Sequence, residues 1–251
     1  HWTQGQAGYA VVFTPRNQDG KSPWSTVSDV TFRYNIVRHA NGAFNLEGWD
    51  DEHDSVQMQR VQVSNNVVYD IDTKVWGGDG GIFLQIGNNP SDITFNNNTA
   101  VHSGTAISVY GTKNGSPWPV DGFVFRDNLL RHNTYGVKGA GQSVGLGTLS
   151  AYFTALTFDR NALAGGSASQ YPAGNYFPTL PDFMASFVDP GAGNFTLAAG
   201  SPFGQASESG GPLGADIATV MQKVEGTPVA APPPASPETP ASSPVPSQDG
   251  S

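Results

Sequence analysis

The chain has 251 residues, of which 13% are charged, and it carries a formal net charge of −9 and no cysteine. The lack of cysteine excludes disulfides and thiolate metal sites. Twelve scattered Lys and Arg residues do not form the basic surface that nucleic-acid binding requires. Because Gly, Asn, Ser and Thr are abundant and no apolar run approaches the length that spans a bilayer, we expect an all-β chain without a transmembrane segment.

A repeat of about thirty residues organises the chain. Five eight-residue segments place apolar residues five and three positions before a fixed Asn, and this alternation predicts a strand with one side in the core. The segments are 30–37, 61–68, 93–100, 123–130 and 156–163, with the Asn at Asn35, Asn66, Asn98, Asn128 and Asn161. Since an amide both donates and accepts, we expect these Asn to form an interior ladder, and we assign to them the left-handed backbone of a tight corner.

A second strand-like run lies between the Asn corners. Its copies are 42–48, 81–87, 105–111 and 135–139, with 8–13 as the equivalent in the first coil. Three short strands per coil predict a right-handed parallel β-helix solenoid. The pattern resembles bacterial secreted members of the pectate-lyase-like superfamily over residues 1–225. The chain starts without Met on the edge of a strand-like run, so we expect further coils before it.

The C-terminal part divides into a closing segment and a tail. Residues 187–216 resemble the end of many extracellular bacterial β-helix proteins, which carry an F-x-L-x-x-x-S-P run and a following L-G-A turn. The matching residues are Phe195, Leu197, Ser201, Pro202, Leu213 and Gly214. The Pro-, Ala- and Ser-rich segment 226–251 cannot bury a core, so we expect a disordered tail, and we expect the protein to be a monomer.

The second run carries the first group of candidate ligand-binding residues. In these family members the ligand groove runs along one sheet, which the resemblance assigns to this strand. Alternation places Phe44, Leu46, Ile82, Leu84, Ile86, Ile107 and Val109 inward and Asn45, Glu47, Gln85, Ser108, Tyr110 and Lys138 outward. Of the outward set we assign Asn45, Glu47, Gln85 and Tyr110 to substrate binding. The alternative is a solvated polar face.

An acidic loop, 48–60, follows one of these strands. Several carboxylates on one loop can hold Ca²⁺ or supply an acid/base pair. We assign Asp50, Asp51 and Asp54 to a candidate Ca²⁺ site, and Asp50 and Asp51 also to catalysis. The spacing matches no EF-hand loop, and a merely solvated acidic loop is the alternative.

Three tryptophans fall on the loops after the second strand of different coils. Trp24, Trp49 and Trp118 would align on one wall, where aromatic planes can pack against sugar rings. Trp76 lies on the opposing insertion and joins this candidate substrate-binding set. The alternative is that each ring packs under its own loop.

A fourth candidate is the position four residues after each Asn, which holds His39, Asp70, His102 and His132. Imidazoles and a carboxylate can bind metal or move protons. Because the position recurs in every coil, we favour a structural turn ladder.

The resemblance implies an extracellular protein, secreted or at the cell surface, that binds and, if catalytic, cleaves an acidic polysaccharide. Lyases of this type use Ca²⁺ and a Lys or Arg base, roles that Asp50, Asp51 and Asp54, and Lys138 or Arg60, fit by residue type. The hydrolase pattern is broken, since Asp50-Asp51 echoes its D-D element but no G-H-G or R-x-K follows. A non-catalytic surface protein or adhesin is the alternative, and the sequence leaves catalysis open.

Overall fold

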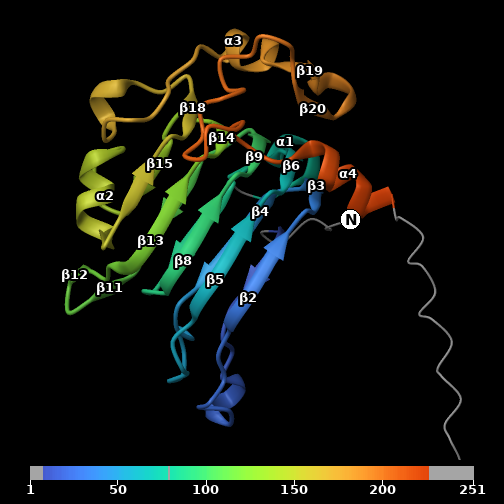
Figure 1. The fold of residues 1–251 in the computed structure, drawn as a ribbon. Coiled ribbons are helices and arrows are strands. Elements are labelled where there is room, and N and C mark those ends of the chain that lie inside the picture. Colours follow the sequence, from blue (N-terminus) through green and yellow to red (C-terminus); the bar gives the residue numbers. More distant parts are fainter. Residues whose placement is uncertain (1–7, 79, 226–251) are drawn as a thin grey trace, which may run out of the picture.

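The chain winds into about five stacked coils of about 32 residues each. The computed structural model describes residues 8–78 and 80–225, and the predicted tail, 226–251, lies outside the described residues. Three parallel sheets run along the coil axis (Figure 1). This confirms the predicted parallel β-helix with three short strands per coil. None of the helices in the described part of the chain has the length and apolar character needed to cross a bilayer.

Each sheet takes one strand, or a strand pair, from every coil. Sheet A contains β1 (Tyr9–Phe13), β4 (Gly42–Glu47), β7 (Leu84–Gly87), β10 (Ile107–Val109) and β15 (Val137–Gly139). Sheet B contains β2 (Ser28–Arg33), β5 (Gln59–Ser64), β8 (Ser91–Asn96), β13 (Val120–Arg126), β16 (Phe153–Thr154) and β17 (Thr157–Asp159). Sheet C contains β3 (Ile36–Ala40), β6 (Val67–Ile71), β9 (Thr99–His102), β14 (Leu129–Arg131) and β18 (Ala162–Ala164). Sheet A is the sheet on which the ligand groove is predicted.

The Asn side chains form a continuous ladder at the corner between sheets B and C. Each Oδ1 accepts from the backbone N–H and from the Nδ2 of the Asn one coil earlier, at 2.9–3.2 Å. The predicted ladder is therefore confirmed. It has a sixth member that the repeat does not reveal, Asn175, because this residue follows Asn161 by only 14 positions.

The left-handed backbone at this corner lies one residue before the ladder Asn, so its assignment to the Asn itself is wrong. The preceding residues have φ between 52° and 59°, and they are Tyr34, Asn65, Asn97, Asp127 and Arg160. The Asn must direct its amide into the corner, so the outward neighbour takes up the turn. These side chains are not free in solvent: Asp127 is buried, and Tyr34 packs against the second apolar core.

The interior is filled by the inward residues of the three sheets. Phe95 contacts Phe44 and Phe125 at ring-centroid distances of 5.5 Å and 6.4 Å, which links successive coils through stacked and edge-on rings. One inward assignment is wrong: Phe83 is fully buried while Ile82 is partly exposed. The regular alternation of sheet A begins only at Leu84, where β7 starts.

The C-terminal coil is covered and the chain then turns back along the solenoid. Helix α2 (Leu146–Tyr152) packs on β15 and β16. Beyond it, α3 (Leu180–Ala185) and the hairpin of β19 (Phe187–Asp189) and β20 (Asn194–Leu197) lie over sheet C (Figure 1). These elements enclose a second, smaller apolar core.

Residues 207–225, which we name the strap, run back over the ladder corner and end in α4 (Ile217–Glu225). The backbone N–H of Gly214 donates to the carbonyl of Asp127 at 2.8 Å. The N–H of Ala215 donates to Thr99 Oγ1 at 3.0 Å, and the next N–H donates to Asn65 Oδ1 at 3.3 Å. The strap thus bonds in turn to the fourth, third and second coils.

Candidate functional site

One coil has a much shorter connection between sheets A and B than its neighbours. The connection of the third coil is residues 88–90, whereas those of the second and fourth coils are 48–58 and 110–119. The longer loops therefore face each other across a gap. Within the fourth-coil loop, β11 (Thr112–Lys113) and β12 (Ser116–Pro117) form a small hairpin.

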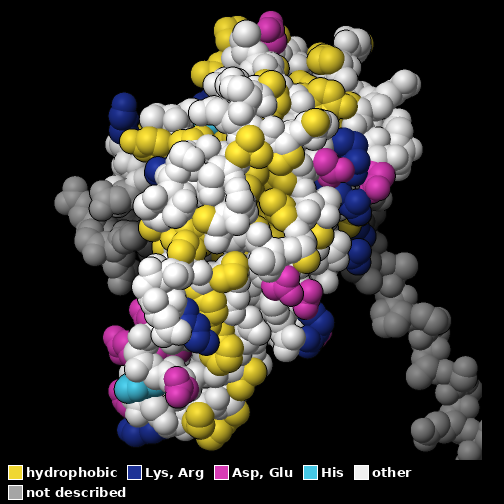
Figure 2. All heavy atoms as spheres, turned by 90° about the vertical axis from the view of Figure 1, so that its left-hand side faces the viewer, with side chains coloured by type: hydrophobic (Ala, Val, Ile, Leu, Met, Phe, Trp, Pro, Cys, Tyr) yellow, Lys and Arg dark blue, Asp and Glu magenta, His cyan; other side chains and the backbone are white. Residues whose placement is uncertain are grey.

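The gap forms a cleft of about 500 Å³. Trp49 and Trp118 close one wall, with ring centroids 6.2 Å apart and planes inclined by 14°. The ammonium of Lys113 lies 4.6 Å from the Trp118 ring centroid. The lining residues are Trp49, Asp50, Asp51, Asn88, Tyr110, Gly111, Thr112 and Trp118. Figure 2, which looks onto the last coil, shows apolar side chains reaching the lower end of the molecule, where acidic and basic side chains gather.

Gly87 lets side chains two coils apart meet beneath this cleft. Glu47 pairs in register with Gly87, and Tyr110 lies at the same level in the next coil. Adjacent strands lie about 4.8 Å apart, so side chains two strands apart meet only if the strand between them leaves room. A Cβ at Gly87 would lie 2.6 Å from both Glu47 Oε2 and Tyr110 Oη. Without it, the Tyr110 hydroxyl donates to Glu47 Oε2 at 2.6 Å.

Glu47 is a nearly buried carboxylate, with 8% of its surface exposed. The Nδ2 of Asn88 donates to its second oxygen, Oε1. Burial raises the pKa of Glu47, and the hydrogen bonds from Tyr110 and Asn88 oppose that rise. Burial, reinforced by the neighbouring carboxylate, also raises the pKa of Tyr110. The cluster presents one carboxylate, one phenol and one amide in fixed orientation.

Asp50 organises the acidic loop. It accepts hydrogen bonds from the backbone N–H groups of Glu52, His53 and Asn17 at 2.9–3.0 Å, which strongly lower its pKa. The guanidinium of Arg16 lies 2.6 Å from Asp51 and 3.4 Å from Asp50. Both oxygens of Asp50 are therefore already engaged.

This arrangement does not fit the expected Ca²⁺ site. Ca²⁺ takes six to eight oxygen ligands, whereas Asp50 and Asp51 are already paired with Arg16. Asp54 contributes its backbone carbonyl to Asn17 Nδ2 at 2.6 Å. In the described ranges, no group of three or more His, Asp or Glu side chains is placed to hold a metal ion.

A polar row extends from the cleft along sheet A. Asn45, Gln85, Ser108 and Lys138 occupy the same register in four successive coils. The Tyr9 hydroxyl donates to Gln85 Oε1 at 2.7 Å, and Gln85 Nε2 donates to Asn45 Oδ1 at 3.4 Å. The row is thus a line of amides and hydroxyls with a lysine at one end.

Comparison of this chain with protein-family models, curated proteins and solved structures finds no significant match. The resemblance to the pectate-lyase-like superfamily therefore rests on the coil pattern alone. The proposed function is based on the geometry of the site.

Other predicted site residues lie away from the cleft. Arg60 is on sheet B, where it forms a two-point ion pair with Asp29 at 2.6 Å and 2.8 Å. Lys138 is on sheet A, and its ammonium donates to the carbonyl of Gln142. The two candidate bases therefore lie on different sheets.

Two of the predicted tryptophans also lie outside the cleft lining. Trp24, with 71% of its surface exposed, belongs to the first-coil loop. Trp76 ends α1 (Thr73–Trp76) on the connection from sheet C to sheet A, with its ring 5.1 Å from that of His39. Of the four tryptophans assigned to substrate binding, Trp49 and Trp118 are the pair that the structure brings together.

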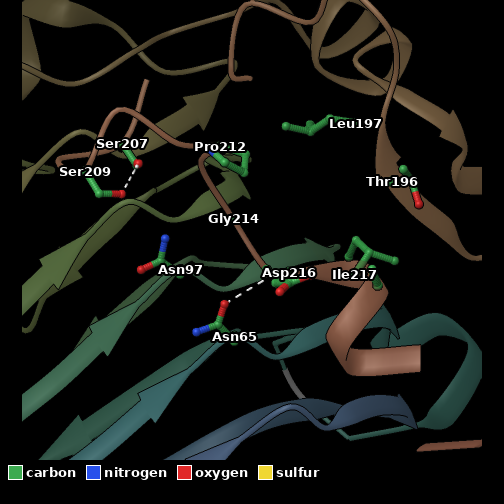
Figure 3. A pocket seen from close by; sticks show the side chains of 12 residues that line it. Asn65, Asn97, Thr196, Leu197, Ser207, Ser209, Pro212, Gly214, Asp216 and Ile217 are labelled. Atoms are coloured by element: carbon green, nitrogen blue, oxygen red, sulfur yellow. Dashed lines mark hydrogen bonds between the residues drawn. The ribbon is translucent and has the colours of Figure 1, made fainter. Parts of the chain in front are cut away.

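A second hollow, of about 510 Å³, lies under the strap (Figure 3). Its polar groups bond to one another: Ser207 and Ser209 share a hydrogen bond of 3.1 Å, and Asn65 accepts from the backbone of Asp216. The residues described as lining it include no aromatic ring. We therefore place the candidate functional site at the cleft between Trp49 and Trp118.

Proposed function

We propose that this protein binds a polysaccharide along sheet A, anchored at the cleft beside Trp49 and Trp118. The observation that supports this most directly is the parallel tryptophan pair next to the Glu47–Tyr110–Asn88 cluster. Sugar rings combine apolar C–H faces with polar hydroxyls, so an aromatic plane beside fixed hydrogen-bonding groups suits them. An extracellular location, secreted or at the cell surface, belongs to the same proposal.

We favour binding over cleavage. Arg60 lies on sheet B and Lys138 three coils from the acidic loop, so neither candidate base faces Asp50 and Asp51. Asp50 is held by three backbone N–H groups, which is the arrangement of a loop-forming residue. Binding needs the aromatic wall and the polar row, and both are present.

Lys113 does not block the aromatic wall. It is exposed, and its contact with the Trp118 ring is a surface cation–π interaction worth about 0.5–1 kcal/mol. A sugar ring that stacks on Trp118 can displace it at that cost. The substitution Lys113→Ala should therefore leave glycan affinity unchanged or raise it slightly.

Isothermal titration calorimetry with a panel of oligosaccharides tests the proposal. Trp118→Ala should weaken binding by about ten-fold or more, as expected for an aromatic anchor. Trp24→Ala is the matched control, because Trp24 is exposed and lies outside the cleft lining, and it should bind as the unmodified protein does. Absence of binding to any oligosaccharide, or equal losses in the two variants, would refute the proposal. Circular dichroism checks that both variants fold.

A further inference from the structure

The cleft is negatively charged. Asp50 and Asp51 line it, and the carboxylate of Glu47 lies directly beneath. The cations close to it are Arg16, which is paired with both aspartates, and Lys113, which lies over the Trp118 ring. Three carboxylates therefore face two cations, in a chain whose net charge is −9.

The polar row beyond the cleft has little charge of its own. Asn45, Gln85 and Ser108 present amides and a hydroxyl, which can donate to and accept from sugar hydroxyls. The one cation of the row, Lys138, is hydrogen-bonded to a backbone carbonyl. Uronic acids are recognised by paired Arg or Lys side chains or by a bridging cation. The two cations described near the cleft are not arranged as such a pair, since Arg16 is bound to Asp50 and Asp51 and Lys113 lies over the Trp118 ring.

On the basis of the proposed function, we propose that the cleft selects a polysaccharide of uncharged sugar units and disfavours uronic acids. This departs from the acidic polysaccharide that the superfamily resemblance implies. A carboxylate entering the cleft would meet the exposed carboxylate of Asp51 at short range, with the buried Asp50 beside it. A hydroxymethyl or ester group at the same position would carry no charge.

Matched pairs of oligosaccharides that differ only in this charge test the inference. Suitable pairs are β-1,4-glucan with β-1,4-glucuronan, β-1,4-mannan with β-1,4-mannuronan, and methyl-esterified with free α-1,4-galacturonan. In the pair whose ring and linkage the protein binds, the uncharged member should bind about five-fold or more tightly at low salt, the effect of one unit charge at contact distance. The difference should shrink as salt screens the charges.

A charge variant separates this inference from the proposed function. Asp51→Asn should raise affinity for the uronate member by about five-fold relative to the uncharged member. Glu225→Gln removes one charge from α4, over the ladder corner, and should change neither. Equal or tighter binding of the uronate by the unmodified protein would overturn the inference while the proposed function stands. Failure to bind any member would overturn both.

Discussion

The Asn ladder provides the sharpest test of how the coils are held together. In Asn98→Ala, five side-chain hydrogen bonds disappear: two that Oδ1 accepts from Asn66, and three that Nδ2 donates to Val63, Asn96 and Asn128. The backbone N–H of Asn66 then has no acceptor in a fully buried corner. One such orphaned donor costs about 1–3 kcal/mol, and each further bond contributes at most about 0.5–1.5 kcal/mol. Because the two hydrogens of Nδ2 are shared among three acceptors, these bonds contribute less than their sum, and we expect a total loss of about 3–5 kcal/mol.

Asn35→Ala is the matched control, because Asn35 is the first described member of the ladder and is partly exposed. Its Nδ2 donates to Arg33 and Asn66, and Asn66 Oδ1 keeps the bond from the Asn35 backbone N–H. No buried group is orphaned, so we expect a loss of about 1 kcal/mol. Urea unfolding followed by circular dichroism measures both variants. Equal losses of unfolding free energy at the two positions would show that the stabilisation by a ladder Asn does not depend on its burial.

Three further predictions concern the cleft, an inward histidine and the strap. Gly87→Ala should separate Tyr110 from its carboxylate partner, because the new Cβ would lie 2.6 Å from the Tyr110 hydroxyl. It should lower stability by about 1–3 kcal/mol and weaken glycan binding, as thermal unfolding and calorimetry would show. His102 is buried, and burial lowers its pKa to about 4. In the unfolded chain His102 has its ordinary pKa near 6.5, so as the pH falls it is protonated there before it is protonated in the folded chain. Stability should fall by up to about 3 kcal/mol as the pH drops from 6.5 to 4, and His102→Gln should flatten this part of a pH series of unfolding curves. Leu213→Ala, at a buried strap position, should cost about 2–5 kcal/mol in urea unfolding. Met221→Ala, at an exposed position of α4, should cost under about 1 kcal/mol, and similar costs for the two would contradict a packed strap.

The sequence was sufficient to predict the coils because the same strand pattern recurs before each Asn of the repeat. Apolar alternation before each Asn defines which side faces inward, and the roughly thirty-residue spacing places each Asn above the last. The sixth ladder residue, Asn175, was beyond this reasoning because it follows Asn161 at about half the usual spacing. The left-handed position carries a residue type that favours this conformation in three coils, at Asn65, Asn97 and Asp127, but Tyr34 and Arg160 hide the pattern in the other two.

The cleft is less visible in the sequence. Trp49 and Trp118 come from the second and fourth coils, and their contact depends on what the third coil lacks. Two signals were present: the connection 88–90 is short, and a glycine stands at the strand position where the neighbouring coils carry Glu47 and Tyr110. Both signals are missing groups, a short loop and a missing side chain, so residue types that bind sugar do not reveal them. The pairing of Arg16 with Asp51 depends on the conformations of the first and second loops. The repeat pattern does not predict these conformations, because the loops differ from coil to coil.

The short third coil explains how a repeat can acquire a site without losing its core. In a solenoid each coil contacts only its neighbours, so a deletion in one connection changes the surface locally. The inward residues of β7, Leu84 and Ile86, remain fully buried. Outside, the same coil carries Gly87 and a minimal loop, and the coils on either side meet across it. The specificity of the cleft therefore depends mainly on side chains from the second and fourth coils, while the third coil sets the space between them and adds Asn88. Lengthening the 88–90 connection should abolish the cleft and leave the ladder intact.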